Sequence, residues 1–499
     1  MSEQEGSRHA SVHGALPPQW DHLWGEPSPF LAPQLSELRE SFSALALDIP
    51  LHDHRAKLGD LVGPFDNYLA PVHRWYPYKE SFSHELPGYF VDRLEVEPAG
   101  TAVDVFAGVA TTALGLRDHG FEQIIGVEYS PFSQFVGETK VSSLTLDLDR
   151  IERMIDDLMC YRTVKGRAAP ALSSFSNPKI FNPSVLDSLL SVRNRIHKLD
   201  WIEPVERGFL LLALASIVEE VSGAMKDGRA LRIIGDRKRA SRMLVSREAL
   251  NRTGDPVRDC LAMQLAGMRE DLEDIAERGG AEATLRHLAG DARNLAEVEG
   301  SEREAPFSAG SASFSIFSPP YLNCIDYSEI YKLELWLLEL INNPEQFRKL
   351  RLGTLRSHPS VDFPDRGYLE GVDKPFARLV DKLSIFIERN HARAAIGRMV
   401  RNYFDDMYRV LAQQAWVLAP GAWMVCIVGN STFSRRIFEG EERKELWRIP
   451  VLTDVILASM AEALGLEEVQ IWNARDLRAR NVSNGSARES AIVARKPGL

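Results

Sequence analysis

Seven short apolar runs, each closed by a small or acidic residue, constrain the fold of this chain more than any other feature. They occupy Thr101–Phe106, Gln123–Glu128, Thr284–Leu288, Ser313–Phe317, Trp423–Gly429, Val469–Trp472 and Ser490–Arg495. Continuous apolar runs of this length are typical of strands buried on both faces, and a helix-length segment separates the first two. The pattern therefore predicts a mostly parallel sheet in a wound α/β domain.

The spacing of these runs predicts insertions. Only 16 residues separate the first two runs, whereas 155 separate the second from the third. Within that long interval, at about 140–282, apolar residues such as Val185, Leu189, Val192 and Ile196 recur at three- and four-residue steps, which indicates helices. A second interval, 342–395, is rich in Pro, Gly, Arg and Asp and predicts a loop-rich insertion.

Composition excludes several classes of protein. The 499 residues carry a net charge of −11, which argues against a surface uniformly coated in positive charge but leaves room for a local basic groove. The four cysteines lie at least 64 positions apart and no His-Glu-x-x-His motif occurs, so we expect neither a disulfide framework nor a metal site. Without a signal-peptide pattern or an apolar stretch of bilayer length, the chain is expected in the reducing cytoplasm.

The turn after the first run favours a nucleoside cofactor. Its small residues, from Asp104 through Gly108 to Thr112, let a ligand approach the backbone at a helix N-terminus. Glu128 ends the second run twenty residues after Gly108, where an acid can accept both hydroxyls of a ribose. Asp291, just beyond the third run, is placed to accept an adenine amino group, although Gly-Asp is also an ordinary turn pair.

The fourth run leads into Ser318-Pro319-Pro320-Tyr321, which predicts a site for an amino group on a flat ring. Two prolines force a rigid, extended exit from the strand and fix the Ser318 hydroxyl and the Pro319 carbonyl as acceptors. Tyr321 adds a flat aromatic face for stacking. A plain Pro-Pro loop is the alternative, but ligands of open α/β sheets bind at this edge.

Together these motifs resemble those of S-adenosylmethionine-dependent amino-methyltransferases acting on DNA. The similar elements are Asp-Val-Phe-Ala-Gly at 104–108, the Glu128 strand, Gly-Asp-Ala at 290–292 and Ser-Pro-Pro-Tyr at 318–321, whose serine resembles the cytosine-N4 subgroup. The segment Trp75–Ser83 resembles the element that helps to hold the methionine part of the cofactor, and the run at 489–496 resembles the last, antiparallel strand. The resemblance covers roughly 70–140 and 284–497, and departs from the family at Ala110, where a second glycine is usual.

The resemblance implies a Rossmann-like, seven-stranded methyltransferase sheet and assigns the site residues. Ser318, Pro319, Pro320 and Tyr321 would be catalytic, and S-adenosylmethionine would be held by Ser83, Asp104, Phe106, Gly108, Ala110, Thr111, Thr112, Glu128 and Asp291. The expected segments are a disordered tail (1–18), an N-terminal segment with the cofactor-binding half (19–140), a helical insertion (141–282), the catalytic half (283–341), a loop-rich insertion (342–395) and the C-terminal part of the sheet (396–499).

Double-stranded DNA is the partner that this resemblance implies, with a cognate restriction endonuclease or a defence-system component as a further candidate. The stretch 227–254 holds eight basic residues against three acids, so we expect phosphate contacts from Arg237, Lys238, Arg239 and Arg242, and from Arg351 and Arg356 in a second cluster. A solvated helix face is the alternative for either cluster. Methylation of adenine N6, a structured RNA substrate and an inactive methyltransferase-derived binding module remain the alternative functions.

Overall fold

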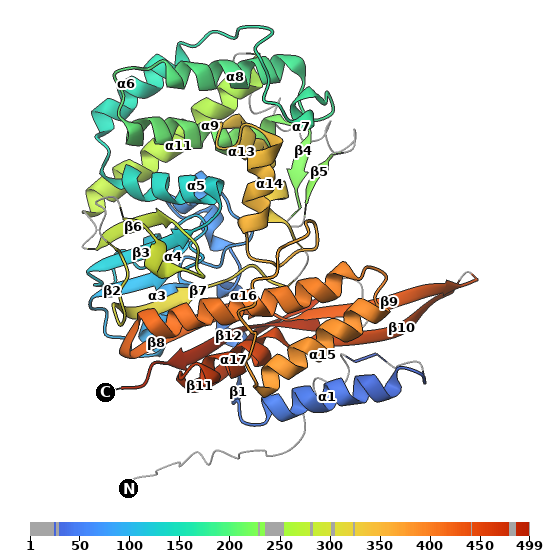
Figure 1. The fold of residues 1–499 in the computed structure, drawn as a ribbon. Helices are drawn as coiled ribbons and strands as arrows, with labels where there is room; N and C mark the ends of the chain where they lie inside the picture. Colours follow the sequence, from blue (N-terminus) through green and yellow to red (C-terminus); the bar gives the residue numbers. More distant parts are fainter. Residues whose placement is uncertain are drawn as a thin grey trace.

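A computed structural model describes residues 24–25, 29–227, 230–234, 254–279, 283–300, 305–322, 325–440, 442–478 and 486–498. The tail predicted over 1–18 lies outside these residues. The central sheet has eight strands in the order β1-β11-β12-β8-β7-β2-β3-β6 (Figure 1). Their bounds are β1 Leu51–Asp53, β2 Thr101–Asp104, β3 Gln123–Glu128, β6 Thr284–Ala289, β7 Ala312–Phe317, β8 Leu418–Gly429, β11 Glu467–Arg478 and β12 Ser486–Arg495.

The α/β fold class predicted from the sequence is confirmed, because all seven apolar runs form strands of this one sheet. Only β12 is antiparallel to its neighbours in the sheet, β11 and β8, as expected for the last strand. The eighth strand, β1, was missed because it is a three-residue edge strand with no apolar run. β1 pairs in parallel with β11.

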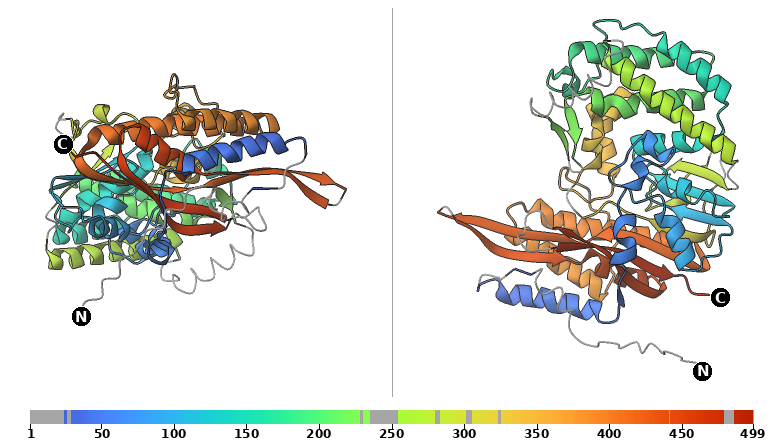
Figure 2. Two further views of the ribbon diagram at one scale, coloured as in Figure 1. Left: turned by 90° about the horizontal axis from the view of Figure 1, so that it is seen from below. Right: turned by 180° about the vertical axis from the view of Figure 1, so that it is seen from behind.

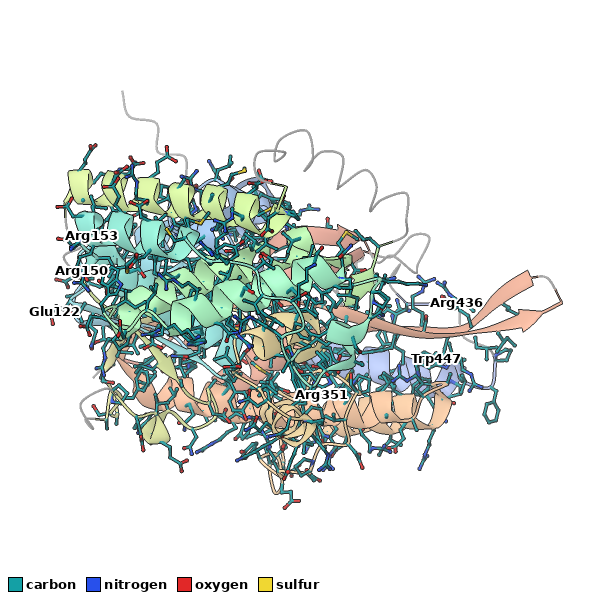
Figure 3. The ribbon with its side chains drawn as sticks, turned by 90° about the horizontal axis from the view of Figure 1, so that it is seen from above. Glu122, Arg150, Arg153, Arg351, Arg436 and Trp447 are labelled. Atoms are coloured by element: carbon teal, nitrogen blue, oxygen red, sulfur yellow. The ribbon has the colours of Figure 1, made fainter. Side chains whose placement is uncertain are left out.

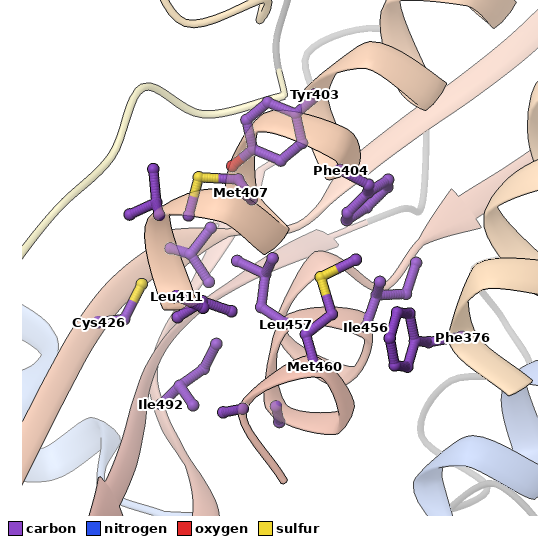
Figure 4. Close-up of a cluster of buried hydrophobic side chains, with 14 of the residues drawn as sticks. Phe376, Tyr403, Phe404, Met407, Leu411, Cys426, Ile456, Leu457, Met460 and Ile492 are labelled. Carbon is purple, nitrogen blue, oxygen red and sulfur yellow. The ribbon is translucent and has the colours of Figure 1, made fainter. Parts of the chain in front are cut away.

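Side chains of the central strands alternate between two cores. Val103, Ile125 and Cys426 face the core formed with α1 (Ala32–Ala46), α15 (Pro375–Asn390), α16 (Ala395–Val417) and α17 (Thr453–Ala463). Ala102 and Ile124 face the core formed with α2 (Arg55–Leu61), α3 (Leu86–Arg93) and α4 (Thr111–Gly115). Burial on both faces explains why these strands lack a polar side. Figure 4 shows α16 and α17 interdigitating over Cys426 and Ile492 of the sheet.

The long interval between β3 and β6 is mainly helical. Its helices are α5 (Pro131–Ser142), α6 (Leu148–Met159), α7 (Ser173–Ser176), α8 (Pro183–His197), α9 (Pro204–Val221) and α11 (Pro256–Arg278). Five of these helices begin directly after a residue whose side chain caps the first turn, namely Ser130, Asp147, Asn182, Glu203 and Asp255. Four of them begin with Pro, whose fixed φ suits that position. Helices α6, α8, α9 and α11 gather at one end of the molecule around their own apolar core (Figure 1). A small antiparallel pair, β4 (Ala224–Lys226) with β5 (Leu231–Ile233), interrupts the helical pattern.

The C-terminal third differs from expectation in the interval 342–395 and in the segment 431–451. The interval 342–395 contains α14 (Pro344–Gly353) and α15, so it is less loop-rich than its composition predicted, because Phe376, Leu379, Val380 and Leu383 bury one face of α15. Two short helices, α12 (Tyr327–Ile330) and α13 (Lys332–Leu337), precede it.

A long two-stranded ribbon, β9 (Ser431–Glu439) with β10 (Glu442–Val451), projects from the body (Figures 1 and 2). No apolar run predicted this ribbon, because groups of charged residues interrupt both of its strands. Trp447 is fully buried against Phe386 of α15 and anchors β10 to the body, whereas Arg436 lies on β9 and pairs with Glu445 (Figure 3). Among the described residues, every helix is too short or too polar to span a lipid bilayer.

Candidate active site

A cavity of about 300 Å³ opens at the carboxyl ends of the parallel strands. Residues from the predicted cofactor half and from the predicted catalytic half line the same space. They include Phe106, Gly108, Glu128, Asp291, Ser318, Pro319, Pro320 and Tyr321, all of which the sequence singled out. The edge of a wound α/β sheet is where ligands of this architecture bind.

The turn after β2 is locked by Asp104. Its carboxylate accepts hydrogen bonds from the Phe106 N–H at 2.9 Å and from the Thr112 hydroxyl at 2.5 Å. Burial raises the pKa of Asp104 to about 7. Asp104, Ala110, Thr111 and Thr112 belong to this turn but do not line the cavity, and their contact with a cofactor stays a prediction.

Two residues of this turn adopt positive φ. Gly108 has φ +52°, and Ala110, which precedes α4, has φ +67°. The left-handed region is disfavoured for a residue with a Cβ, which explains why glycine is usual at the second position. Ala110 nevertheless keeps the left-handed conformation that begins α4, so the departure from the family pattern leaves the turn intact.

Glu128 ends β3 with its carboxylate held by backbone groups. One oxygen accepts from the Gly108 N–H at 2.9 Å and the other from the Ser130 N–H at 2.6 Å. A carboxylate has about four acceptor positions, so each oxygen keeps capacity for a ligand hydroxyl. Burial is the main cause that raises the pKa of Glu128 to about 7, and the charge of Asp104 adds to it.

Asp291 lies after β6 and is paired with a buried arginine. Arg293 donates to both carboxylate oxygens, at 2.8 and 2.7 Å, and also to Asp406 at 2.9 Å. This fork fixes the Asp291 carboxylate at the wall of the cavity, where it remains partly exposed.

The Ser318–Tyr321 segment is connected to the last two strands by a chain of side chains. The Tyr321 hydroxyl donates to Glu489 of β12 at 2.5 Å, and Arg475 of β11 donates to the other Glu489 oxygen at 2.5 Å. Burial and the Glu489 charge raise the pKa of Tyr321, whereas a hydrogen bond from Ser318 acts in the opposite direction. A Cβ on Gly429 would approach the Tyr321 ring to 2.7 Å, so the absence of a side chain there makes room for the ring.

Ser83 is not part of the cavity. Its buried hydroxyl accepts from the Glu85 N–H at 3.2 Å, just before α3, and its contact with a cofactor stays a prediction. Ser81 occupies the cavity wall instead and bonds to the Thr111 hydroxyl at 2.8 Å. The Trp75–Ser83 segment therefore reaches the cavity through Ser81 and not through Ser83.

Sequence reasoning missed several residues of the wall. The rings of Tyr78 and Tyr331 stack with centroids 5.3 Å apart, and the Tyr331 hydroxyl donates to Glu80 at 2.5 Å. The other Glu80 oxygen is buried and has no hydrogen-bond partner among the residues that the structure describes, and burial raises the pKa of this carboxyl. Tyr78 and Glu80 lie inside the Trp75–Ser83 segment, and the resemblance of that segment to a cofactor-binding element was the sequence signal that could have identified them.

His358 and Asp326 also line the cavity and had no sequence signal. Burial lowers the pKa of His358, which favours a neutral ring. Its Nδ1 accepts from the Ser360 N–H at 3.3 Å and lies 3.6 Å from Asp326, while its buried Nε2 has no partner in the structure.

The predicted DNA-binding residues fall into two groups. Arg237, Lys238, Arg239 and Arg242 lie outside the described residues, as does Cys324. Arg351, at the end of α14, donates to Asp326 at 2.9 Å near the cavity (Figure 3). Arg356 is 0% exposed and bound to Asp405 and Asp406, so its expected contact with DNA is wrong, because charge in a sequence does not distinguish a buried ion pair from a surface one.

No family profile matches the chain. The chain is 22% identical over 463 residues to the type II methyltransferase M.BsoBI of Geobacillus stearothermophilus, covering 86% of this chain and 85% of that protein. It is 24% identical over 426 residues to the type II methyltransferase M.AvaI of Nostoc sp. and to that of Anabaena variabilis, covering 81% of each chain.

Solved structures with some likeness include a SAM-dependent methyltransferase from Methanosarcina mazei and the rRNA methyltransferase AviRa from Streptomyces viridochromogenes. The first has a TM-score of 0.28 at 8% identity and covers 82% of this chain and 98% of that one. The second has a TM-score of 0.26 at 14% identity and covers 87% and 92%. These scores are too low to support an argument about function. The sequence matches extend over more than four fifths of this chain, which is therefore similar in sequence to type II methyltransferases.

Proposed function

We propose that this chain transfers a methyl group from S-adenosylmethionine to the exocyclic N4 of cytosine in double-stranded DNA. The observation that supports it best is that Ser318 and Tyr321, whose hydroxyl donates to Glu489, share one cavity with Glu128. The similarity to type II methyltransferases over more than four fifths of the chain favours the same reaction class.

The cavity suits S-adenosylmethionine. Glu128 has acceptor capacity for two ribose hydroxyls, and Asp291 presents a fixed carboxylate for the adenine amino group. The unpaired Glu80 oxygen and the stacked Tyr78 and Tyr331 rings suit the cationic methionine part, since carboxylates and aromatic faces both attract cations. When bound, this cofactor supplies an electrophilic methyl group on a sulfonium centre.

The hydrogen bond from Tyr321 to Glu489 determines whether Ser318 can donate to Tyr321 or accept from it. Glu489, paired with Arg475, accepts from Tyr321, so the Tyr321 oxygen is left to accept from Ser318. A serine that donates to tyrosine keeps its lone pairs for another donor. Ser318 and the Pro319 carbonyl therefore make two acceptors for the hydrogens of an amino group.

Two acceptors at the amino group compensate for the low nucleophilicity of its nitrogen. The lone pair of the cytosine N4 is delocalised into the ring, which makes this nitrogen a poor nucleophile. Hydrogen bonds to Ser318 and to the Pro319 carbonyl hold the amino group with its lone pair toward the methyl donor, and positioning then provides much of the rate enhancement. The base must first leave the duplex to reach the cavity, where the Tyr321 ring can stack on it.

No strong base is required before attack, because the leaving group is already cationic and the amino proton can depart afterwards. No covalent adduct with the base forms on this route, so Cys324 has no chemical part in it. We further propose that the basic residues between 237 and 242 neutralise DNA phosphates from the helical insertion.

The test is transfer of a labelled methyl group to duplex DNA of mixed sequence, after calorimetry has measured binding of S-adenosylmethionine. We expect micromolar cofactor binding and label in DNA that depends on Ser318 and Tyr321. Cofactor or DNA binding without transfer would identify a binding module, label in RNA alone would identify a different acceptor, and activity lost on replacing Cys324 with Ala would contradict the amino-methylation route.

A further inference from the structure

Arg475 reaches the cavity from the last two strands of the sheet. It lies opposite Glu489 in the register between β11 and β12, directly after a bulge at Asn473 and Arg475. Its Nε donates to Glu489 at 2.5 Å, and both residues line the cavity beside Tyr321. The bulge turns this arginine toward the edge where Ser318 and Tyr321 lie.

The guanidinium of Arg475 keeps unused donors. Arginine has five N–H groups, and in the part of the chain that the structure describes only Nε has a hydrogen-bond acceptor. Nη1 lies against Gly63, where an added Cβ would come within 3.0 Å of it. Glu489 on one side and the Gly63 loop on the other therefore hold the planar fork in one orientation.

We propose that Arg475 reads the flipped base by donating from Nη1 and Nη2 to the N3 and O2 atoms of cytosine. This inference rests on the proposed function. Cytosine presents an amino donor followed by two acceptors, N3 and O2, along one edge. Adenine presents the amino donor and N1 but only a C–H at the next position, so the second hydrogen bond of the fork is available to cytosine alone.

In this arrangement the amino group, N3 and O2 of cytosine each have a hydrogen-bonding partner in the protein. Ser318 and the Pro319 carbonyl accept from the amino group, and the charged chain through Tyr321 and Glu489 leads to Arg475 on the same wall. Thymine has a carbonyl in place of the amino group and an N–H in place of the N3 acceptor. It is therefore mismatched with the acceptors at Ser318 and Pro319 and with the first donor of Arg475. Arg475 is thus a specificity residue, and the simpler alternative is that it only neutralises Glu489.

The experiment compares duplexes that carry cytosine or 3-deazacytosine at the target position, in the sequence context found by modified-base sequencing of DNA from a host that expresses the chain. 3-Deazacytosine keeps the amino group and O2 but replaces N3 with C–H. For each enzyme, kcat/KM on cytosine divided by kcat/KM on the analogue gives a preference ratio, which cancels general losses of activity.

We expect Arg475→Gln to lower kcat/KM on cytosine by roughly 10- to 100-fold, the effect of losing a charged hydrogen bond, and to lower the preference ratio at least tenfold. Arg475→Lys keeps the charge beside Glu489 but not the fork, and should also lose most of the ratio. Arg495→Gln, at a half-buried arginine at the far end of β12, is the matched control and should keep the ratio within twofold.

An unchanged ratio in Arg475→Gln, with cofactor affinity retained, would overturn the inference and leave Arg475 as a counter-ion of Glu489. If Arg475→Gln does not fold, Arg475→Lys provides the same comparison. Failure of the proposed function is seen separately, because the wild-type chain would then methylate adenine or transfer no methyl group at all.

Discussion

Two carboxylates, Glu128 and Glu489, line the same cavity but are held in different ways. Glu128 accepts from two backbone N–H groups, both within twenty residues of it. Glu489 is held by two side chains, Tyr321 and Arg475, the first of them 168 residues away in the sequence. The cofactor half of the cavity is therefore held by backbone groups at Glu128, whereas the base half at Glu489 depends on linked side chains, where one truncation affects every member.

The largest effect is expected in the base half. Tyr321→Ala removes the stacking face and leaves Glu489 without its hydroxyl donor, so kcat should fall roughly 100-fold or more. Cofactor affinity should stay within twofold, because the backbone-held half is unchanged. Tyr321→Phe, which keeps the ring, should lose about tenfold. Single-turnover rates and calorimetry check this, and a parallel loss of cofactor affinity would contradict the separation of the two halves.

In the cofactor half of the cavity, we expect a substitution to weaken cofactor binding rather than to slow turnover. Glu128→Ala removes the acceptor for the ribose hydroxyls and should weaken S-adenosylmethionine binding roughly 10- to 100-fold. DNA affinity should change less than twofold. Glu138→Ala, an exposed residue of α5, is the control. Unchanged calorimetric affinity in Glu128→Ala would remove the ribose assignment.

A smaller effect concerns pH. The pKa values of Glu128 and Asp104 are both raised to about 7 in the folded chain, so between about pH 4.5 and 7 the folded state binds more protons than the unfolded state. The stability of the cofactor-free protein should therefore fall as pH rises through this window and level off above it. Glu128→Gln should remove about half of that fall in thermal melts. If the melting temperature changes equally with pH in both proteins, Glu128 is not the group responsible for the fall in stability.

The same comparison explains what the sequence could predict. The strands, the turn at 104–112 and Glu128 follow from local patterns, because a buried parallel strand and the turn after it are encoded within a few residues. Tyr321 was found through its motif, but Glu489 and Arg475 were not, since only the register of β11 against β12 brings them to the cavity. Arg356 was misjudged for a related reason, because Asp405 and Asp406 neutralise it from a distant helix.

The smallest effect tests the departure at Ala110. Ala110→Gly and Ala113→Gly each remove a buried methyl group from the start of α4, but only Ala110 has a positive φ. Relief of that conformation should make Ala110→Gly less destabilising than Ala113→Gly by about 1 kcal/mol in chemical denaturation. Equal losses would indicate that the left-handed turn stores no strain.

The identity of the methylated nucleoside tests the central claim most directly. Duplex DNA incubated with the chain and S-adenosylmethionine is digested to nucleosides and analysed by mass spectrometry beside standards of each methylated base. The account predicts N4-methylcytosine, absent when Tyr321→Ala replaces the wild-type chain. N6-methyladenine or 5-methylcytosine as the product, or no methylated nucleoside from a chain that binds both cofactor and DNA, would contradict it.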